Sequence, residues 1–196
     1  MDPNAGKRIL ANKLSREELQ AKLDAETFHR TTVSFYKYVI IENPQELRDA
    51  LFAQWSQWDC LGRIYVSREG INAQMNVPEH HWDAFDTYIH GIEYFHDVPF
   101  KLAVTDKTEG KSFLKLVVKV REQIVADGLQ PEDYDVTDVG AHLTAKDWNE
   151  AIEKYDPVVV DMRNHYESEI GHFKGAVLPE AETFREELPM VLEKLK

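Results

Sequence analysis

The pattern of hydrophobic and polar residues changes its period several times between residues 31 and 105. The first segment, TTVSFYKYVII at residues 31–41, is rich in β-branched and aromatic residues and predicts a strand. Asn43-Pro44 then interrupts the chain, and proline is favoured in the first turn of a helix. The helix predicted next has an apolar stripe at spacings of three and four residues, formed by Leu47, Leu51, Trp55 and Trp58.

Further strands and a second helix complete this pattern. GRIYVS (62–67) and GINAQMNV (70–77) are predicted strands joined by a tight turn, and VPFKLAV (98–104) is another. The helix between them is predicted to start at Pro78 and to end near Gly91. The resulting β-α-β-β-α-β order is typical of a ferredoxin-like domain, an antiparallel sheet with two helices on one face. The apolar side of this second helix consists of Trp82, Phe85 and Ile89.

Capping and alternation extend the prediction at both ends. Ser15 begins a capping-box pattern that predicts a short helix to about Glu26, and residues 1–30 are interpreted as a helical extension outside the domain. After Gly110, the alternation in SFLKLVVKV (112–120) predicts one more strand. The ferredoxin-like domain is therefore expected to cover residues 31–121.

One face of this last strand is basic. Residues 99–121 hold six Lys or Arg and two acidic residues, a local charge of +4 in a chain of net charge −12. Cations and an aromatic ring on a sheet are typical of RNA binding, but lysines on an edge strand also protect a sheet against aggregation. Both interpretations stay open from the residues alone. The candidate RNA-binding residues are Lys111, Phe113, Lys115, Lys119, Arg121 and Arg63.

The hairpin at 62–77 adds polar side chains to the candidate surface. Gly70 fits a turn position that needs a positive φ, and Asn72 and Gln74 are then predicted to point to one face. The alternative is a turn residue followed by a solvated face. Tyr65 is equally compatible with RNA contact and with packing.

Residues 122–142 are interpreted as an acidic linker, because they contain six Asp or Glu and no Lys or Arg. A second, α/β unit is predicted from residue 143, with a helix at 145–155, the strand VVVDM (158–162) buried on both faces, a short strand near 177 and a helix from Glu182. The 54 positions of 143–196 are too few for a parallel sheet covered on both faces. We therefore expect a fragment of a domain, and an exposed sheet edge of this kind favours a homodimer.

The amino-acid composition indicates where the protein is located and which kinds of site it lacks, but it does not indicate a reaction. The 43% hydrophobic and 30% charged residues are ordinary for a globular protein, and a single cysteine, Cys60, excludes an internal disulfide and any cysteine-rich metal site. The His residues show no metal-ligand spacing, so we expect no metal, and no cofactor motif is recognisable. Without an apolar run of roughly 18–20 residues or a secretory signal, we expect a cytoplasmic protein with no membrane partner.

The most specific motif is DMRNHYESEIGHFKGA at residues 161–176. Asp161 and Arg163 follow a predicted buried strand, and ligands of α/β proteins bind at that end of the sheet. In the structural alternative, Asp161 caps the next turn and pairs with Arg163, while His172 packs under Gly175.

This motif resembles the first half of a rhodanese domain. Together with RTTVSFYKY, GRIYVSREGINAQMNVP and GKSFLKLVVKVREQIVADG, in this order and spacing, it resembles the bacterial rhodanese-containing tRNA uridine hydroxylases from about residue 13 to 196. The resemblance implies a ferredoxin-like (acylphosphatase-like) domain followed by the first half of a rhodanese-like α/β domain. It also implies oxygen-dependent hydroxylation of the wobble uridine of tRNA to 5-hydroxyuridine, with molecular oxygen as co-substrate and the tRNA anticodon region as partner.

In these relatives the rhodanese loop, Cys-Thr-Gly-Gly-Ile-Arg-Cys, carries the catalytic cysteine, and it is expected beyond residue 196. The resemblance therefore implies no catalytic residue in this chain, with Asp161 and Arg163 supporting that loop. Cys60 is interpreted as a buried structural thiol, and the fragment itself is expected to be inactive. Two alternatives stay open: a rhodanese-type sulfurtransferase, and a non-catalytic RNA- or protein-binding module.

Overall fold

The computed structural model describes residues 14–103, 112–124, 128–129, 134–181 and 183–195. The chain divides after Ile124 into two units, the first of which contains the sheet. Within the described ranges, none of the helices is long and apolar enough to cross a membrane.

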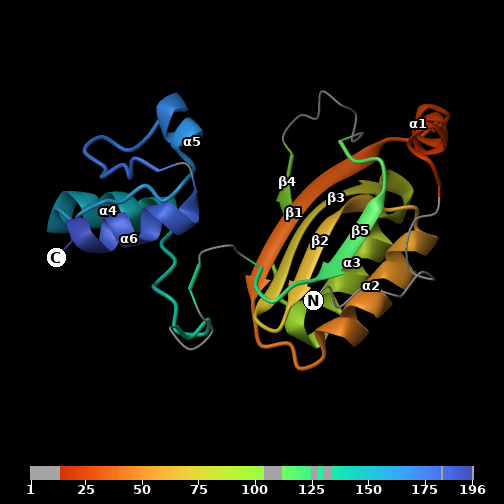
Figure 1. Ribbon diagram of the computed structural model, residues 1–196, viewed down its shortest axis with the longest axis horizontal. Coiled ribbons are helices and arrows are strands. Elements are labelled where there is room, and N and C mark those ends of the chain that lie inside the picture. The colour runs from red at the N-terminus through yellow and green to blue at the C-terminus, as the bar shows by residue number, and fades with distance from the viewer. Residues whose placement is uncertain (1–13, 104–111, 125–127, 130–133, 182, 196) are drawn as a thin grey trace. The chain divides into compact units, whose positions relative to one another are not determined.

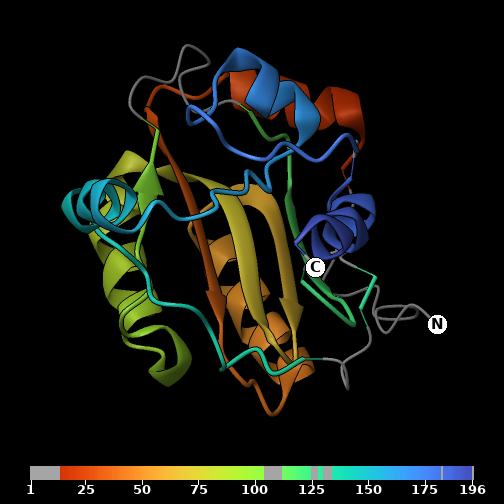
Figure 2. The same ribbon diagram turned by 90° about the vertical axis from the view of Figure 1, so that its left-hand side faces the viewer.

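The centre of the sheet is formed by three antiparallel strands, Arg30–Tyr38 (β1), Gly70–Pro78 (β3) and Leu61–Ser67 (β2), with β3 in the middle. Lys101–Leu102 (β4) pairs antiparallel with β1, and Leu116–Val120 (β5) pairs parallel with β2. Figures 1 and 2 both show β5 beside β2. The strand order among the described residues is β4-β1-β3-β2-β5, so β4 and β5 form the edges.

Helices Pro44–Gln57 (α2) and Trp82–His90 (α3) cover one face of the sheet (Figure 1). The order β1-α2-β2-β3-α3-β4 with the strands arranged β4-β1-β3-β2 is the ferredoxin-like arrangement, as predicted. α3 begins later than the predicted start at Pro78, because the 3₁₀ turn Glu79–His81 comes first. Gly70 has φ +146°, and a Cβ there would clash with the Lys37 carbonyl oxygen, so this turn requires glycine.

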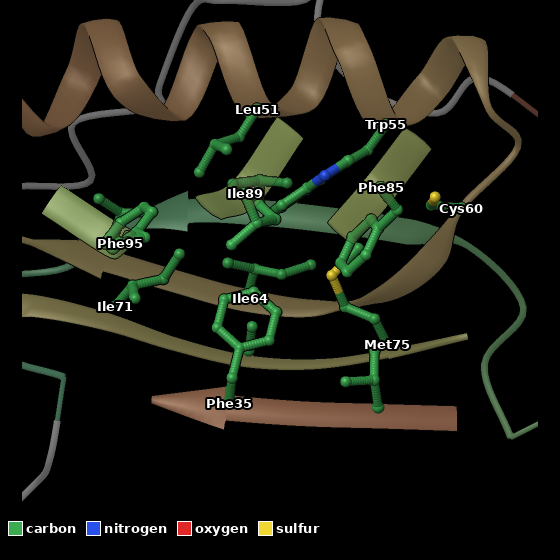
Figure 3. Packing of buried hydrophobic residues seen from close by; sticks show 14 of the residues in the cluster. Phe35, Leu51, Trp55, Cys60, Ile64, Ile71, Met75, Phe85, Ile89 and Phe95 are labelled. Atoms are coloured by element: carbon green, nitrogen blue, oxygen red, sulfur yellow. The ribbon is translucent and has the colours of Figure 1, made fainter. Parts of the chain in front are cut away.

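The core lies between α2, α3 and the sheet (Figure 3). Trp55 and Phe85 are fully buried with their rings 6.0 Å apart, and the Phe35 ring of β1 lies 6.4 Å from that of Phe85. Burial of a large apolar side chain stabilises the fold by about 1.5–3 kcal/mol. The strands supply alternate residues to this core, among them Val33, Phe35, Ile64, Val66, Ile71, Ala73 and Met75.

The helix Arg16–Asp24 (α1) packs on the first unit, whereas the sequence placed it outside the domain. Its capping box is present as predicted: the Ser15 hydroxyl accepts from the Glu18 N–H, and the Glu18 carboxylate accepts from the Ser15 N–H. Leu23 is 3% exposed, and Lys22 pairs with Asp59 at 2.5 Å. A short helix depends on such packing for its stability, and local sequence does not reveal it.

The two later strands are shorter than the sequence predicts. Among the described residues of the segment 98–104, only Lys101–Leu102 is a strand, and Pro99 has no N–H to donate to a ladder. Of the segment 112–120, only Leu116–Val120 pairs with β2. Residues 104–111 lie outside the described ranges.

The second unit contains Ala145–Tyr155 (α4), His165–Ile170 (α5) and Phe184–Lys194 (α6) among its described residues. Thr144 caps α4 as predicted, since its hydroxyl accepts a hydrogen bond from the Asp147 N–H at 3.2 Å. α6 begins two residues after the predicted start, and α5 is not among the predicted helices.

The prediction of a strand VVVDM buried on both faces is wrong. Its only ladder contact among the described residues is a parallel bridge between Val160 and Val177. Val158 is 67% exposed. A strand is buried on both faces only when layers cover both sides of a sheet, and the described part of this unit supplies a single bridge. The rhodanese-like half domain therefore stays a prediction.

A buried carboxyl group lies in α6. Glu187 is 1% exposed, and neither of its carboxyl oxygens has a hydrogen-bond partner among the described residues. Burial raises its pKa, the negative charge of Asp161 raises it further, and His165 acts in the opposite direction. Because an unpartnered buried carboxylate is costly, folding favours the protonated form of Glu187.

Cys60 is expected to be unreactive in the folded chain. Its side chain is 2% exposed, and burial raises the pKa of the thiol to about 12. At about pH 8, only a small fraction of Cys60 is therefore in the reactive thiolate form. Dithionitrobenzoate should label the native chain slowly and the urea-unfolded chain at once. Rapid labelling of the native chain would contradict the burial of this side chain.

Replacing Glu187 by Gln is expected to stabilise the second unit at neutral pH. The pKa of Glu187 is higher in the folded chain than in the unfolded chain. Its contribution to folding stability is therefore fully present below the unfolded pKa and is lost as the pH rises through the folded pKa. Thermal unfolding followed by circular dichroism should show a gain for Glu187→Gln that grows from about pH 4 to about pH 7. Glu186→Gln, at the exposed neighbouring position, is the matched control. Equal melting temperatures for the Glu187→Gln variant and the unmodified chain at neutral pH would show that the carboxyl group is not destabilising.

Candidate functional site

The face of the sheet opposite α2 and α3 presents polar and aromatic side chains in rows across the strands. Residues directly opposite each other on paired strands lie on the same face. Tyr36 of β1 is opposite Asn72 of β3, which is opposite Tyr65 of β2, and Tyr65 is opposite Lys119 of β5. Tyr36 is 50% exposed and the other three are half-buried, so this row is accessible from solvent.

A second row runs parallel to the first. The register places Lys101, Ser34, Gln74, Arg63 and Val117 side by side from β4 to β5. Lys101, Gln74 and Arg63 are exposed. We call the two rows together, with Arg121 just past β5, the open face.

Each tyrosine of the open face has a cation over its ring. The Lys101 ammonium lies 5.3 Å from the centroid of the Tyr36 ring, and the Arg121 guanidinium lies 5.2 Å from that of Tyr65. Such contacts contribute roughly 0.5–1 kcal/mol at exposed sites. They hold two cations next to two flat aromatic surfaces.

The charge of the open face is opposite to that of the whole chain. Its described residues include four cations, Arg63, Lys101, Lys119 and Arg121, and no Asp or Glu. The chain has a net charge of −12. A local basic surface of this kind attracts a polyanion that the rest of the molecule repels, and the rings and amides beside it suit nucleobases.

The structure brings together some of the candidate RNA-binding residues. Arg63, Lys119 and Arg121 surround Tyr65 on the open face. Phe113 and Lys115 precede β5: the former is half-buried, and the latter lines a cavity of about 310 Å³ with residues of α1. Lys111 lies outside the described residues. RNA binding by this set stays a prediction.

Protection of a sheet edge, the structural alternative, accounts for only part of the surface. β5 is an edge strand, so Lys119 suits that role. β2 and β3 are inner strands, however, and they carry the exposed Arg63 and Gln74. Edge protection gives no reason for polar side chains at those positions.

Tyr36 and Lys101 of the open face were not among the site residues predicted from the sequence. Tyr36 lies within the first predicted strand, directly after the buried Phe35. Lys101 lies far from Tyr36 in the chain, and only the pairing of β4 with β1 brings them together. The period-two alternation of β1 is the signal that could have separated Tyr36 from Phe35.

In the second unit, Asp161 and Arg163 form a two-pronged ion pair. Arg163 Nε lies 2.9 Å from Asp161 Oδ1, and Arg163 Nη2 lies 2.6 Å from Asp161 Oδ2. Nη2 also donates to the Gly171 carbonyl oxygen at 2.7 Å. The hydrogen bonds from Arg163 lower the pKa of Asp161, which therefore stays ionised and is unsuited to general-base chemistry at neutral pH.

This pair borders a cavity of about 510 Å³ that is also lined by Trp148, His172 and Phe173. His172 Nδ1 contacts the Ser168 carbonyl oxygen at 2.9 Å. The alternative in which His172 packs under Gly175 is wrong, because a Cβ added at Gly175 would have no heavy atom within 4 Å. Arg163 thus connects Asp161 with Gly171, the residue that follows α5. Across the described ranges, no three His, Cys, Asp or Glu side chains are grouped so that they could hold a metal ion.

Comparison with known proteins gives matches to both units. The family described as "UPF0176 acylphosphatase like domain" matches residues 30–124, which include the whole sheet. A protein of Leptospira interrogans named tRNA uridine(34) hydroxylase is 53% identical over 189 residues, which is 96% of this chain and 51% of that protein. Proteins of the same name from Pectobacterium carotovorum and Yersinia enterocolitica are 46% and 45% identical over 95% and 96% of this chain, and 52% and 53% of their own lengths.

The chain thus spans about half the length of the curated relatives it matches. The matches cover nearly all of its residues, in the second unit as well as the first. Nearly the whole chain is therefore similar to part of the proteins named tRNA uridine(34) hydroxylase, and its residues 30–124 match the family described as "UPF0176 acylphosphatase like domain".

Proposed function

We propose that this chain acts in the oxygen-dependent hydroxylation of the wobble uridine of tRNA to 5-hydroxyuridine. The observation that carries the proposal is 53% identity over 96% of the chain to a protein named tRNA uridine(34) hydroxylase. Molecular oxygen is the proposed co-substrate, and the cytoplasm, where tRNA is found, is the proposed location.

In this proposal the first unit holds the anticodon region of the tRNA on its open face. Backbone phosphates would be neutralised by Arg63, Lys119 and Arg121. This role is supported by the absence of Asp and Glu from the described residues of the open face, since no carboxylate there would repel a phosphate. Phosphate contacts of this kind position an RNA without reading its sequence. The reacting uridine must then be presented to another part of the protein.

The second unit is proposed to support the chemistry and not to perform it. Cys60, the only cysteine of residues 1–196, is buried in the first unit with a raised pKa, so it is unsuited to act as a nucleophile. Arg163 binds both Asp161 and the Gly171 carbonyl oxygen at the end of α5, and this ordered pair is proposed to support a rhodanese-type catalytic loop. The predicted homodimer is favoured by exposed apolar side chains in this unit, including Tyr166, Ile170 and Phe173.

Removal of the gene that encodes this chain is expected to abolish 5-hydroxyuridine and its derivatives at the wobble position. Bulk tRNA from the deletion strain should be digested to nucleosides and measured by mass spectrometry, with a strain re-expressing the gene as control. Unchanged 5-hydroxyuridine would contradict the proposal. Loss of a thiolated nucleoside instead would identify a sulfurtransferase.

The double variant Arg63→Glu, Lys119→Glu is expected to bind tRNA more weakly and with a flatter salt dependence. Each lost phosphate contact should reduce the slope of log K against log salt by about one. Lys146→Glu with Lys154→Glu on exposed positions of α4 changes the net charge equally and is the matched control. If both double variants lose affinity to the same extent, the open face has no special role in tRNA binding.

A further inference from the structure

We propose that Tyr36 and Tyr65 are stacking platforms for two unpaired RNA bases, with the Asn72 amide between them. The inference deepens the proposed function and rests on it for the choice of RNA as ligand. It adds base contacts to the phosphate contacts described above.

The two tyrosines occupy equivalent positions on either side of the central strand. Tyr36 and Tyr65 lie in one row, each directly opposite Asn72 of the central strand β3. Their neighbours along the strands, Phe35 and Ile64, are fully buried in the core, so the backbone beneath both tyrosines is held in place. A stacking platform needs such a rigid support, because an ordered ring loses little entropy when a base binds.

Each ring also has a cation available for the attached phosphate. Lys101 lies over the ring of Tyr36 and Arg121 over that of Tyr65, at 5.3 and 5.2 Å from the ring centroids, so a base that stacks on this side of a ring displaces the cation toward its phosphate. A nucleotide presents a flat base and a phosphate within the same residue, and this pairing of ring and cation occurs twice on the open face. Non-specific single-strand binding proteins combine the same two elements.

The separation of the rings favours single strands over duplexes. The strands that carry Tyr36 and Tyr65 are separated by one strand, so their backbones lie about 10 Å apart at the strand spacing of a sheet. Bases stacked on each other rise by only about 3.4 Å. Two bases can therefore occupy both rings only when they are splayed apart, as in an RNA loop, while a base-paired helix keeps its bases stacked.

The amide side chains between the rings supply hydrogen bonds of both kinds. Asn72 is half-buried in the row of the tyrosines, and Gln74 is exposed in the adjacent row between Ser34 and Arg63. An amide can donate and accept, so it can pair with the edge of a base. An acidic peptide would use the cations of this face but neither the rings nor the amides.

The test compares Tyr36→Leu and Tyr65→Leu with Tyr36→Phe and Tyr65→Phe, since leucine removes the aromatic face and phenylalanine keeps it. Tyr155→Leu is the matched control, because Tyr155 of α4 is 68% exposed and also has a lysine 4.8 Å from its ring centroid. The probes are an anticodon stem-loop RNA carrying 2-aminopurine in its loop and a fully paired RNA of equal length. Binding is measured at several salt concentrations.

Each leucine variant is expected to bind the stem-loop about tenfold more weakly, at every salt concentration and with an unchanged salt slope. The phenylalanine and Tyr155 variants should bind like the unmodified chain, and binding of the paired RNA should not change. Quenching of 2-aminopurine fluorescence on binding should decrease in each leucine variant, because each keeps only one of the two rings. Full affinity of the leucine variants, or equal losses for the loop and paired RNAs, would overturn the proposal.

A second measurement does not depend on the folding of any variant. A stem-loop with 5-bromouridine in its loop, bound to the unmodified chain and irradiated, should cross-link to the peptides that contain Tyr36 or Tyr65. Cross-links found only elsewhere would overturn the proposal. If base stacking is found while the deletion strain keeps its 5-hydroxyuridine, the proposed function fails and this inference stands. If the deletion strain loses 5-hydroxyuridine but neither tyrosine contacts a base, this inference alone fails.

Discussion

The alternation of side chains in β1, β3 and β2 is the constraint on which the first unit depends. Phe35, Ile64 and Met75 are buried against α2 and α3, and this burial fixes the register of the three strands. A slip of one residue would exchange the two faces of the sheet and bury Tyr36, Arg63 and Gln74 in the core. The same apolar packing that stabilises the domain therefore determines which polar side chains face solvent together.

This constraint explains how an acidic protein can present a basic surface. The cations of the open face come from β2, β4, β5 and the residue after β5. Of these segments, only β5 and its flanking residues contain enough Lys and Arg to indicate a basic surface from the sequence. Pairing of the strands collects them, and two of them are held against tyrosine rings. In the second unit, by contrast, Asp161 neutralises Arg163 directly, so that arginine serves local order. The two units thus use their cations in different ways.

Much of the first unit was predictable because its local signals agree with its packing. The apolar stripe of α2 and the glycine turn before β3 predict the elements that form, and the Ser15 capping box does the same for α1. The edge strands were overestimated, since Pro99 cannot donate to a ladder and only Leu116–Val120 of the last predicted strand is in register with β2. VVVDM was misjudged because a run of valines indicates a strand but not the layers that would cover it. The partnership of Tyr36 with Lys101 is a long-range consequence of strand order, which no local pattern contains.

The central claim is that RNA binds the open face of the sheet, and nuclear magnetic resonance of the ¹⁵N-labelled chain tests it most directly. At 22.7 kDa the chain is small enough for each amide to be followed during titration with the anticodon stem-loop. The account predicts shifts at the amides around Tyr36, Arg63, Asn72, Lys101 and Lys119, with little change along α2 and α3. Shifts concentrated on the outer surfaces of those two helices, with the strand amides unmoved, would contradict it.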